Sequence, residues 1–370
     1  MSEPLICAGC GLLCDDVTAE GTALTPECAL GSRWLAARRD AGGAAASIDG
    51  APADVTAALD RAVELLGAAR RPLLHGFDGA TVEDARAAVT LADRLGALVR
   101  VDRAPDPEAV ARRGSSTATL GEIRDRAEVV VVWREDPEVT HPRLLERLGS
   151  GATLVVVDDR DTATAARADV RLRWAAGRDL EAIRSLHVLE RELPLTEDDL
   201  AGELRGLLDR LHAVPHAAFV HGPGLGGPRA ALALYELVRA LSDQRHVVTL
   251  GLPPVAGSAG ADAVLTWQTG YPAAVDLASG HPELALAVDE GVDVAVCVEA
   301  PARPGVTTIA LSALPVADAA VHIATAPPGV AAPGTAHRLD EVPLALAAPW
   351  PADRPTAAQL LARIGEGLAR

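Results

Sequence analysis

The chain has 370 residues and a mass of 38.1 kDa, and its 49% hydrophobic and 23% charged residues provide a sizeable core and exclude a disordered protein. A formal net charge of −17 argues against nucleic acid as a partner, and the absence of lysine excludes Schiff-base enzymes and a lysine-dependent phosphate loop. No apolar run reaches the roughly 20 residues of a membrane span and the N-terminus resembles no secretory signal, so we expect a soluble, cytoplasmic protein without membrane contact.

From residue 54 onward the sequence predicts alternating helices and strands. The β-branched runs Glu128–Trp133 and Thr153–Asp158 are typical of parallel strands that are covered on both faces. The remaining predicted strands are Pro72–His75, Leu98–Asp102, Ala217–His221, Val247–Leu250, Val292–Val298 and Val306–Ala310. The predicted helices are Asp54–Gly67, Thr81–Leu95, a helix from the glycine-rich turn at 222–227 through Leu241, and Ala357–Leu368.

Such alternation predicts an α/β protein with two doubly wound parallel-sheet lobes. Residues 1–47 form a small cysteine-rich head, which ends at an Ala/Gly stretch. The polar, helix-prone stretch at 190–215 is the expected boundary between the lobes, so we predict a first lobe at 48–190 and a second at 191–370.

Four of the five cysteines, Cys7, Cys10, Cys14 and Cys28, follow a C-x2-C-x3-C-x13-C pattern. A disulfide framework is improbable in a cytoplasmic protein, which leaves a 4Fe–4S cluster, a zinc ion or four reduced thiols. The tight C-x2-C-x3-C turn favours the cluster, because zinc sites more often pair two C-x2-C turns. The fifth cysteine, Cys297, is predicted to be a small buried apolar residue in a strand.

The segment CAGCGLLCDD, followed by the fourth cysteine, closely resembles the head of the B subunit of formylmethanofuran dehydrogenase, a family of the molybdopterin oxidoreductase superfamily. Four later segments resemble the same family in the same order: 118–143, 153–183, 266–282 and 325–344. The resemblance therefore covers nearly the whole chain. It implies lobes of the molybdopterin-oxidoreductase type.

The resemblance also implies a cleft for a molybdopterin cofactor, formed by these segments and by the glycine-rich turn at 222–227. The residues implied to line it are Thr119, Gly121, Trp133, Asp136, Asp158, Arg160, Gly177, Asp179, Gly222, Gly224, Thr269, Gly270, Gly334 and Thr335.

Several positions depart from the family pattern. Ala118 occupies the position of the metal ligand, and a methyl group cannot ligate molybdenum or tungsten. Arg134 replaces a glycine, and Glu135 puts an acid where the phosphates of the dinucleotide would approach. We therefore expect that the Mo/W bis-molybdopterin guanine dinucleotide is absent and that the chain has no catalytic residue. His141 is either a vestigial active-site histidine or a structural cap, and we prefer the cap.

The resemblance thus implies a B-type subunit of a complex that handles formyl groups and formate with tetrahydromethanopterin. The implied complex is of the bacterial formyltransferase/hydrolase type, and its amidohydrolase-like and formyltransferase-like subunits are the expected partners. We predict a non-redox scaffold that retains a 4Fe–4S cluster on its four cysteines. The alternative is an active Mo/W-bis-pterin dehydrogenase that interconverts CO2 and formate, with electron transfer through the cluster. A weaker third interpretation is a stand-alone electron-transfer protein.

Overall fold

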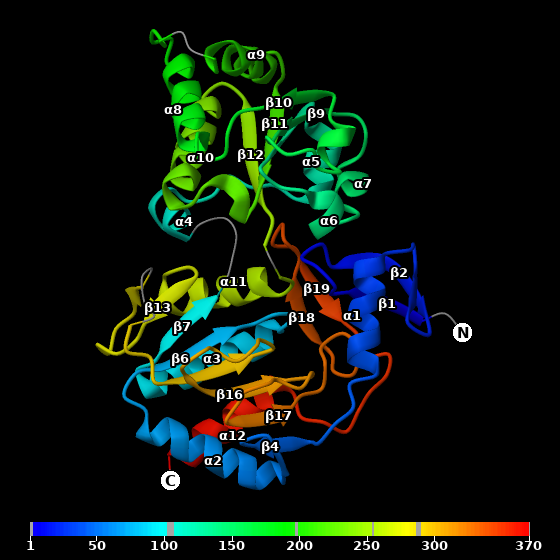
Figure 1. Cartoon of the computed structure of the whole chain (residues 1–370), viewed down its shortest axis with the longest axis vertical. Helices are drawn as coiled ribbons and strands as arrows, with labels where there is room; N and C mark the ends of the chain where they lie inside the picture. The colour runs from blue at the N-terminus through cyan, green and yellow to red at the C-terminus, as the bar shows by residue number, and fades with distance from the viewer. Residues whose placement is uncertain (1–2, 102–106, 197–198, 254, 286–289, 370) are drawn as a thin grey trace. The chain divides into compact units, whose positions relative to one another are not determined.

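The computed structural model describes residues 3–101, 107–196, 199–253, 255–285 and 290–369, with the side chains of residues 107 and 108 left aside. The chain divides into two compact units, which are described separately: Met1–Arg103 with Val255–Arg370, and Ala104–Pro254 (Figure 1). None of the helices in the described part of the chain combines the length and apolar character of a membrane span.

This division differs from the predicted one, because the expected boundary near residue 190 lies inside the second unit. That predicted boundary would lie between α8 (Asp179–Glu190) and α9 (Ala201–His212). Both helices bury leucines in the core of that unit, among them Leu186, Leu204 and Leu211. The stretch is polar only on its outer face, so its average composition concealed the buried stripe.

The cysteine-bearing head is part of the first unit. Its antiparallel three-stranded sheet consists of β1 (Glu3–Cys7), β2 (Cys14–Glu20) and β3 (Ala23–Thr25). Helix α1 (Ala29–Arg39) follows, with Cys28 at its N-cap.

The rest of the first unit is built on a nine-stranded sheet in the order β14-β13-β7-β6-β15-β16-β17-β4-β5. The five central strands are parallel, and the four outer ones pair antiparallel. The parallel strands are β6 (Pro72–Gly76), β7 (Leu98–Val101), β15 (Val294–Val298), β16 (Thr307–Ser312) and β17 (Val321–Ala324). The outer strands are β4 (Ala46–Ile48), β5 (Ala51–Ala53), β13 (Ala274–Asp276) and β14 (Glu283–Leu284).

Helices pack against one face of this sheet. They are α2 (Val55–Ala68), α3 (Val82–Leu95), α11 (Ser258–Thr269) and α12 (Ala357–Leu368), and their apolar sides form the main core of the unit. Over the other face, the segment 299–306 covers Ala295 and Cys297. That segment joins β15 to β16 and is too short for a helix plus its turns, so this sheet is not doubly wound as predicted. A hairpin of β18 (Gly334–His337) and β19 (Pro343–Leu346) completes the unit.

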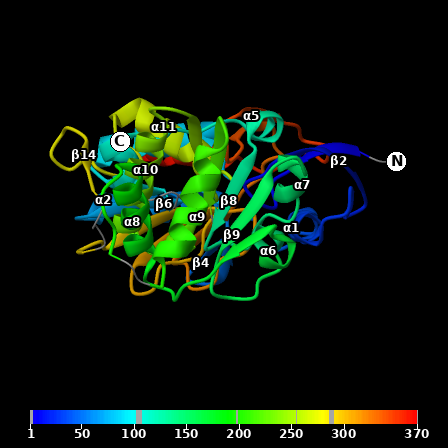
Figure 2. The same cartoon turned by 90° about the horizontal axis from the view of Figure 1, so that it is seen from above.

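The second unit has a fully parallel five-stranded sheet in the order β10-β9-β8-β11-β12. Its strands are β8 (Val129–Trp133), β9 (Thr153–Val157), β10 (Val170–Leu172), β11 (His216–His221) and β12 (His246–Gly251). Helices α8, α9 and α10 (Pro228–Leu241) bury their apolar sides on one face, and α5 (Leu120–Arg126) and α7 (Leu144–Leu148) lie on the other (Figure 2). The short helices are α4 (Pro107–Arg113), α6 (Pro137–Thr140), η1 (Ala165–Arg167) and η2 (Pro223–Leu225). The predicted parallel α/β architecture is confirmed.

Candidate functional site

The fold brings the four cysteines of the head together. Cys7 ends β1 and Cys14 begins β2, where the two residues are paired across the hairpin, and Cys10 lies in the turn between them. Cys28 caps α1, and its Sγ accepts a hydrogen bond from the amide of Gly31 at 3.4 Å. None of the four forms a disulfide in the part of the chain that the structure describes.

Gly31 allows α1 to approach these thiols. A Cβ at this position would lie 2.8 Å from Sγ of Cys7 and 2.6 Å from a methyl group of Leu24, so only glycine fits without displacement. Burial raises the pKa of the Cys10 thiol to about 12, and the nearby thiols of Cys14, Cys7 and Cys28 add to that rise. Ionised thiolates in this setting need a compensating positive charge, which an iron–sulfur core or a metal ion supplies.

Within the described ranges, no group of three or more His, Cys, Asp or Glu side chains, the four thiols of the head included, is already arranged to hold a metal ion. A tetrahedral zinc site with Zn–S bonds of about 2.3 Å requires sulfurs about 3.8 Å apart, whereas a 4Fe–4S core is larger and holds its four ligands farther apart.

A second group of predicted residues meets at the carboxyl edge of the five-stranded sheet. The strand order reverses between β8 and β11, and ligands of open α/β sheets bind outside the carboxyl ends of the strands at such a point. Trp133 ends β8 and is buried, and Asp179 begins α8. The indole of Trp133 donates to Oδ1 of Asp179 at 2.9 Å, and the indole of Trp174 donates to the same atom at 3.2 Å.

Arg134 occupies the centre of this edge. Its side chain is 4% exposed, its Nε donates to Oδ1 of Asp179 at 2.9 Å, and one of its terminal nitrogens donates to Oδ1 of Asp159 at 2.6 Å. The other terminal nitrogen donates to the carbonyl oxygen of Trp174 at 2.8 Å. All three nitrogens of the guanidinium are therefore bonded to groups of the chain itself.

Glu135 engages the glycine-rich turn that follows β11. The amide of Gly224 donates to Oε1 of Glu135 at 3.1 Å, and burial raises the pKa of this carboxyl. A Cβ on Gly224 would overlap the carbonyl oxygen of Arg134, and a Cβ on Gly222 would overlap the Glu135 carboxylate. The glycines thus accommodate the chain's own 134–135 segment. The amide of Gly224, which a phosphate would need, binds a carboxylate instead.

The other predicted residues of this edge are also held by internal contacts. Asp136 accepts hydrogen bonds from the amide and the hydroxyl of Thr164, at 3.0 and 2.6 Å. Asp158 is buried after β9; burial would raise its pKa, but the hydrogen bonds and charge of Arg160 hold it below the ordinary value. A hollow of about 660 Å³ at this edge of the sheet is lined by three acids and two arginines: Glu135, Asp136, Asp159, Arg134 and Arg160. Carboxylates in its wall disfavour a dinucleotide phosphate.

The remaining predicted cleft residues lie at or near the ends of helices, or on the β18 strand. Thr119 caps α5 and accepts the amide of Glu122, Gly121 lies within α5, and Gly177 precedes α8. In the first unit Thr269 and Gly270 end α11, and Thr335 on β18 next to Gly334 donates to Glu83 through its amide and hydroxyl, each at 2.9 Å.

Ala118 and His141 also lie in the second unit. Ala118 is buried just before the N-cap of α5 and offers only a methyl group. His141 ends α6, with its amide donating to the carbonyl oxygen of Pro137 and its Nδ1 3.1 Å from the hydroxyl of Thr140. Burial lowers the pKa of His141 to about 4, so its imidazole is neutral at pH 7. Taken together, these residues do not fit a Mo/W bis-pterin site.

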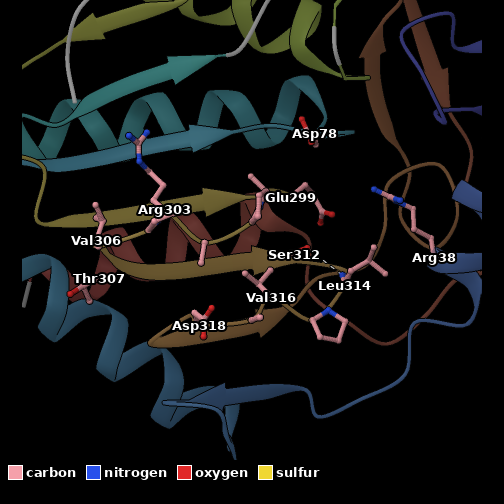
Figure 3. Close-up of a pocket in the computed structure, with 17 residues that line it drawn as sticks. Arg38, Asp78, Glu299, Arg303, Val306, Thr307, Ser312, Leu314, Val316 and Asp318 are labelled. Carbon is pink, nitrogen blue, oxygen red and sulfur yellow. Dashed lines mark hydrogen bonds between the residues drawn. The ribbon is translucent and has the colours of Figure 1, made fainter. Parts of the chain in front are cut away.

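The sequence did not indicate a second hollow, which lies in the first unit at the carboxyl ends of β15 and β16 (Figure 3). We call it the Arg38 pocket. It measures about 950 Å³, and the residues that define it here are Arg38, Asp78, Glu299, Arg303, Leu314 and Val316. The one indication of this pocket in the sequence is Glu299, the acid that directly follows the predicted strand at 292–298.

No protein-family model matches the chain. It is 29% identical over 253 residues to the B subunit of the tungsten-containing formylmethanofuran dehydrogenase 2 of Methanocaldococcus jannaschii, covering 62% of this chain and 58% of that protein. It is 28% identical over 255 residues to the B subunit of the formyltransferase/hydrolase complex Fhc of Methylorubrum extorquens, covering 65% of this chain and 68% of that protein. The chain therefore spans less than two thirds of the length of the dehydrogenase polypeptide.

Two solved structures share the fold. A chain of the formyltransferase/hydrolase complex FhcABCD from Methylorubrum extorquens, solved with methylofuran, superposes with a TM-score of 0.72 at 26% identity, covering 88% of this chain and 99% of that one. Acetylene hydratase from Pelobacter acetylenicus gives a TM-score of 0.64 at 12% identity, covering 99% of this chain and 69% of that one, which shows the fold alone. The resemblance predicted from the sequence is confirmed.

Proposed function

Since the chain is related to the B subunits of formylmethanofuran dehydrogenase and of the formyltransferase/hydrolase complex, we propose that it is the B-type subunit of such a complex in one-carbon metabolism. Its role there is that of a non-redox scaffold with a degenerate Mo/W-pterin site. Its partners are amidohydrolase-like and formyltransferase-like subunits. Its lobes are of the molybdopterin-oxidoreductase type.

The observation that carries the scaffold role is the occupation of the reversal point by Arg134. A guanidinium bonded to Asp179 and Asp159 takes the place in which a nucleotide would be bound. Displacing it would leave the buried carboxylate of Asp179 without its cation, which costs several kcal/mol. A dinucleotide would also meet Glu135, and a metal would find no ligand at Ala118.

We further propose that Cys7, Cys10, Cys14 and Cys28 hold a 4Fe–4S cluster. Such a cluster supplies one-electron transfer or cross-links the head. The support for it is the convergence of the four thiols, the amide of Gly31 aimed at Sγ of Cys28, and the close approach of Gly31 to Cys7.

The test is elemental analysis for Fe, Mo, W and Zn on the complex purified without oxygen from its native host. We expect about four iron atoms per chain and neither molybdenum nor tungsten. Iron should be lost in Cys10→Ala and retained in Cys297→Ala, a matched control outside the head. Molybdenum or tungsten at about one per chain would overturn the scaffold role and establish the active dehydrogenase. Finding zinc, or none of the four metals, would refute the iron–sulfur cluster but would not affect the scaffold role.

A further inference from the structure

The Arg38 pocket lies at the second point where a parallel sheet reverses its strand order. From β6 the chain leads to β7 on one side, and from β15 it leads to β16 and β17 on the other. Asp78 lies two residues beyond the end of β6, and Glu299 directly follows β15. The position is therefore the one where α/β sheets bind ligands, and a hollow of about 950 Å³ lies there.

The backbone that presents the two acids is held in an uncommon conformation. Phe77 and Glu299 have φ angles of 76° and 52°, in the left-handed region that non-glycine residues rarely adopt. The amide of Phe77 donates to the carbonyl oxygen of Val298 at 2.6 Å, and the amide of Glu299 donates to that of Leu311 at 2.9 Å. Strain of this kind persists where neighbouring structure enforces it, and it clusters at ligand sites.

Arg38 brings a cation without a hydrogen-bonding partner to the pocket. Its guanidinium carbon lies 5.7 Å from the ring centre of Trp34, and the group makes no hydrogen bond or ion pair with any residue that the structure describes. Burial lowers the pKa of Arg38, while the charges of Glu299 and Asp78 oppose that fall. Five N–H donors in a partly desolvated site are costly until an acceptor binds them.

Glu299 faces Arg38 with one carboxyl oxygen already engaged (Figure 3). Its Oε1 accepts hydrogen bonds from the amide of Ala313 at 2.9 Å and from the hydroxyl of Thr325 at 2.7 Å. Both bonds end on Oε1, which leaves Oε2 as the oxygen able to contact a ligand. Arg38 forms no ion pair with Glu299 or Asp78, and all three residues line the same hollow.

We propose that the Arg38 pocket binds a small zwitterion of the α-amino acid class, with its carboxylate on Arg38 and its ammonium group between Asp78 and Glu299. At Arg38 a simple anion would also face the carboxyls of Asp78 and Glu299, and between those carboxyls a simple cation would also face Arg38. A molecule with both charges can place its carboxylate at Arg38 and its ammonium group at the two carboxyls. Leu314 and Val316 provide apolar contact for its side chain.

The experiment is isothermal titration calorimetry of the full chain with each of the twenty L-amino acids. Propionate and ethylamine serve as the two halves of alanine, and the deaminated acid of the best ligand is titrated beside it. We expect at least one amino acid to bind with a Kd below about 1 mM, and about tenfold more tightly than its deaminated acid. Arg38→Met should weaken binding at least about tenfold, whereas Arg33→Met, an exposed arginine on the same helix, should not change it.

Glu299→Gln keeps the oxygen that accepts from Ala313 and Thr325 but removes the negative charge, and it should also weaken binding. Absence of binding by all twenty amino acids at about 10 mM would overturn the proposal. Equal binding of the deaminated acid would also overturn it, as would unchanged affinity in Arg38→Met. The ligand comparison uses the unaltered chain, so it decides the matter even if a variant fails to fold. The scaffold role does not depend on whether the Arg38 pocket binds an amino acid.

Discussion

At the scale of single residues, Arg134 fills the reversal point of the five-stranded sheet. Its φ of 56° lies in the left-handed region, which fits a position where the family pattern has glycine. The side chain nevertheless packs inward and bonds to Asp179, Asp159 and the carbonyl oxygen of Trp174. Its side chain thus closes this edge of the sheet with an ionic network of the chain's own groups.

We expect Arg134→Met to lower the free energy of unfolding by about 3–5 kcal/mol, because it leaves buried Asp179 without its cation. Arg124→Met removes an exposed pair with Asp125 that water screens, and it should leave the free energy of unfolding nearly unchanged. Urea denaturation of the purified chain measures both. Similar losses in the two variants would show that the Arg134 network adds little to stability.

His221 makes stability depend on pH. Burial lowers its pKa to about 4, whereas an unfolded histidine titrates near 6.5. Its neutral form is fully accommodated above about pH 6.5, and stability falls by roughly 1.4 kcal/mol per pH unit as the pH drops from there toward 4, because only the unfolded chain then takes up a proton.

In His221→Phe that loss should vanish, so the variant should gain about 2 kcal/mol relative to the parent between pH 7 and pH 5. Phe219→Leu, a buried change on the same strand without a titratable group, should show a constant difference. Urea midpoints at several pH values provide the measurement. A difference for His221→Phe that does not vary with pH would contradict the assignment.

At the scale of elements, Asp84 joins two helices that are far apart in the chain. Its Oδ2 accepts from the amide and hydroxyl of Thr81 at the start of α3, and its Oδ1 accepts from the amide of Ala358 at 2.7 Å in the first turn of α12. Asp84 is 2% exposed, so water cannot replace these bonds.

Asp84→Ala should therefore destabilise the chain by about 2–4 kcal/mol and increase amide exchange at the start of α12. The N-cap of α2 supplies the comparison: the exposed Asp54 accepts from local groups, among them the amide of Thr56, so Asp54→Ala should destabilise the chain less than Asp84→Ala and leave α12 unaffected. Hydrogen exchange and thermal unfolding read out the two effects. Protection of α12 that survives in Asp84→Ala would refute the link.

At the scale of the whole molecule, a related chain of similar extent is part of the FhcABCD complex. Aromatic residues are scarce here, yet Trp267 is 62% exposed and Tyr271 is 37% exposed, both at the end of α11. Exposed aromatic side chains are enriched in protein interfaces, which agrees with the proposed role in an assembly.

An affinity-tagged chain purified from its host should therefore elute well above its own 38.1 kDa, together with formyltransferase-like and amidohydrolase-like subunits. Native mass spectrometry provides the measurement. Recovery of a 38.1 kDa species alone, at low salt and high protein concentration, would contradict the assembly. Unrelated partners would contradict the assigned complex.

The sequence by itself determined the local structure, the α/β class and the kinship. Runs such as Val129–Trp133 form strands, and the cysteine spacing brings Cys7 and Cys14 together, because both depend on residues close in the chain. The residues at Ala118 and Arg134 likewise led to the prediction of a lost metal site, which stays a prediction. These inferences needed only side-chain chemistry at known positions.

Only the tertiary structure decided the division into units, the hydrogen bonds of Arg134 and the Arg38 pocket. The first unit combines two segments separated by about 150 residues, and pairing such as that of β6 with β15 has no local signal. Arg38, Asp78 and Glu299 are distant in sequence and gain meaning only as neighbours around one hollow. Burial, which decides whether a charge has a partner, is a property of the folded chain alone.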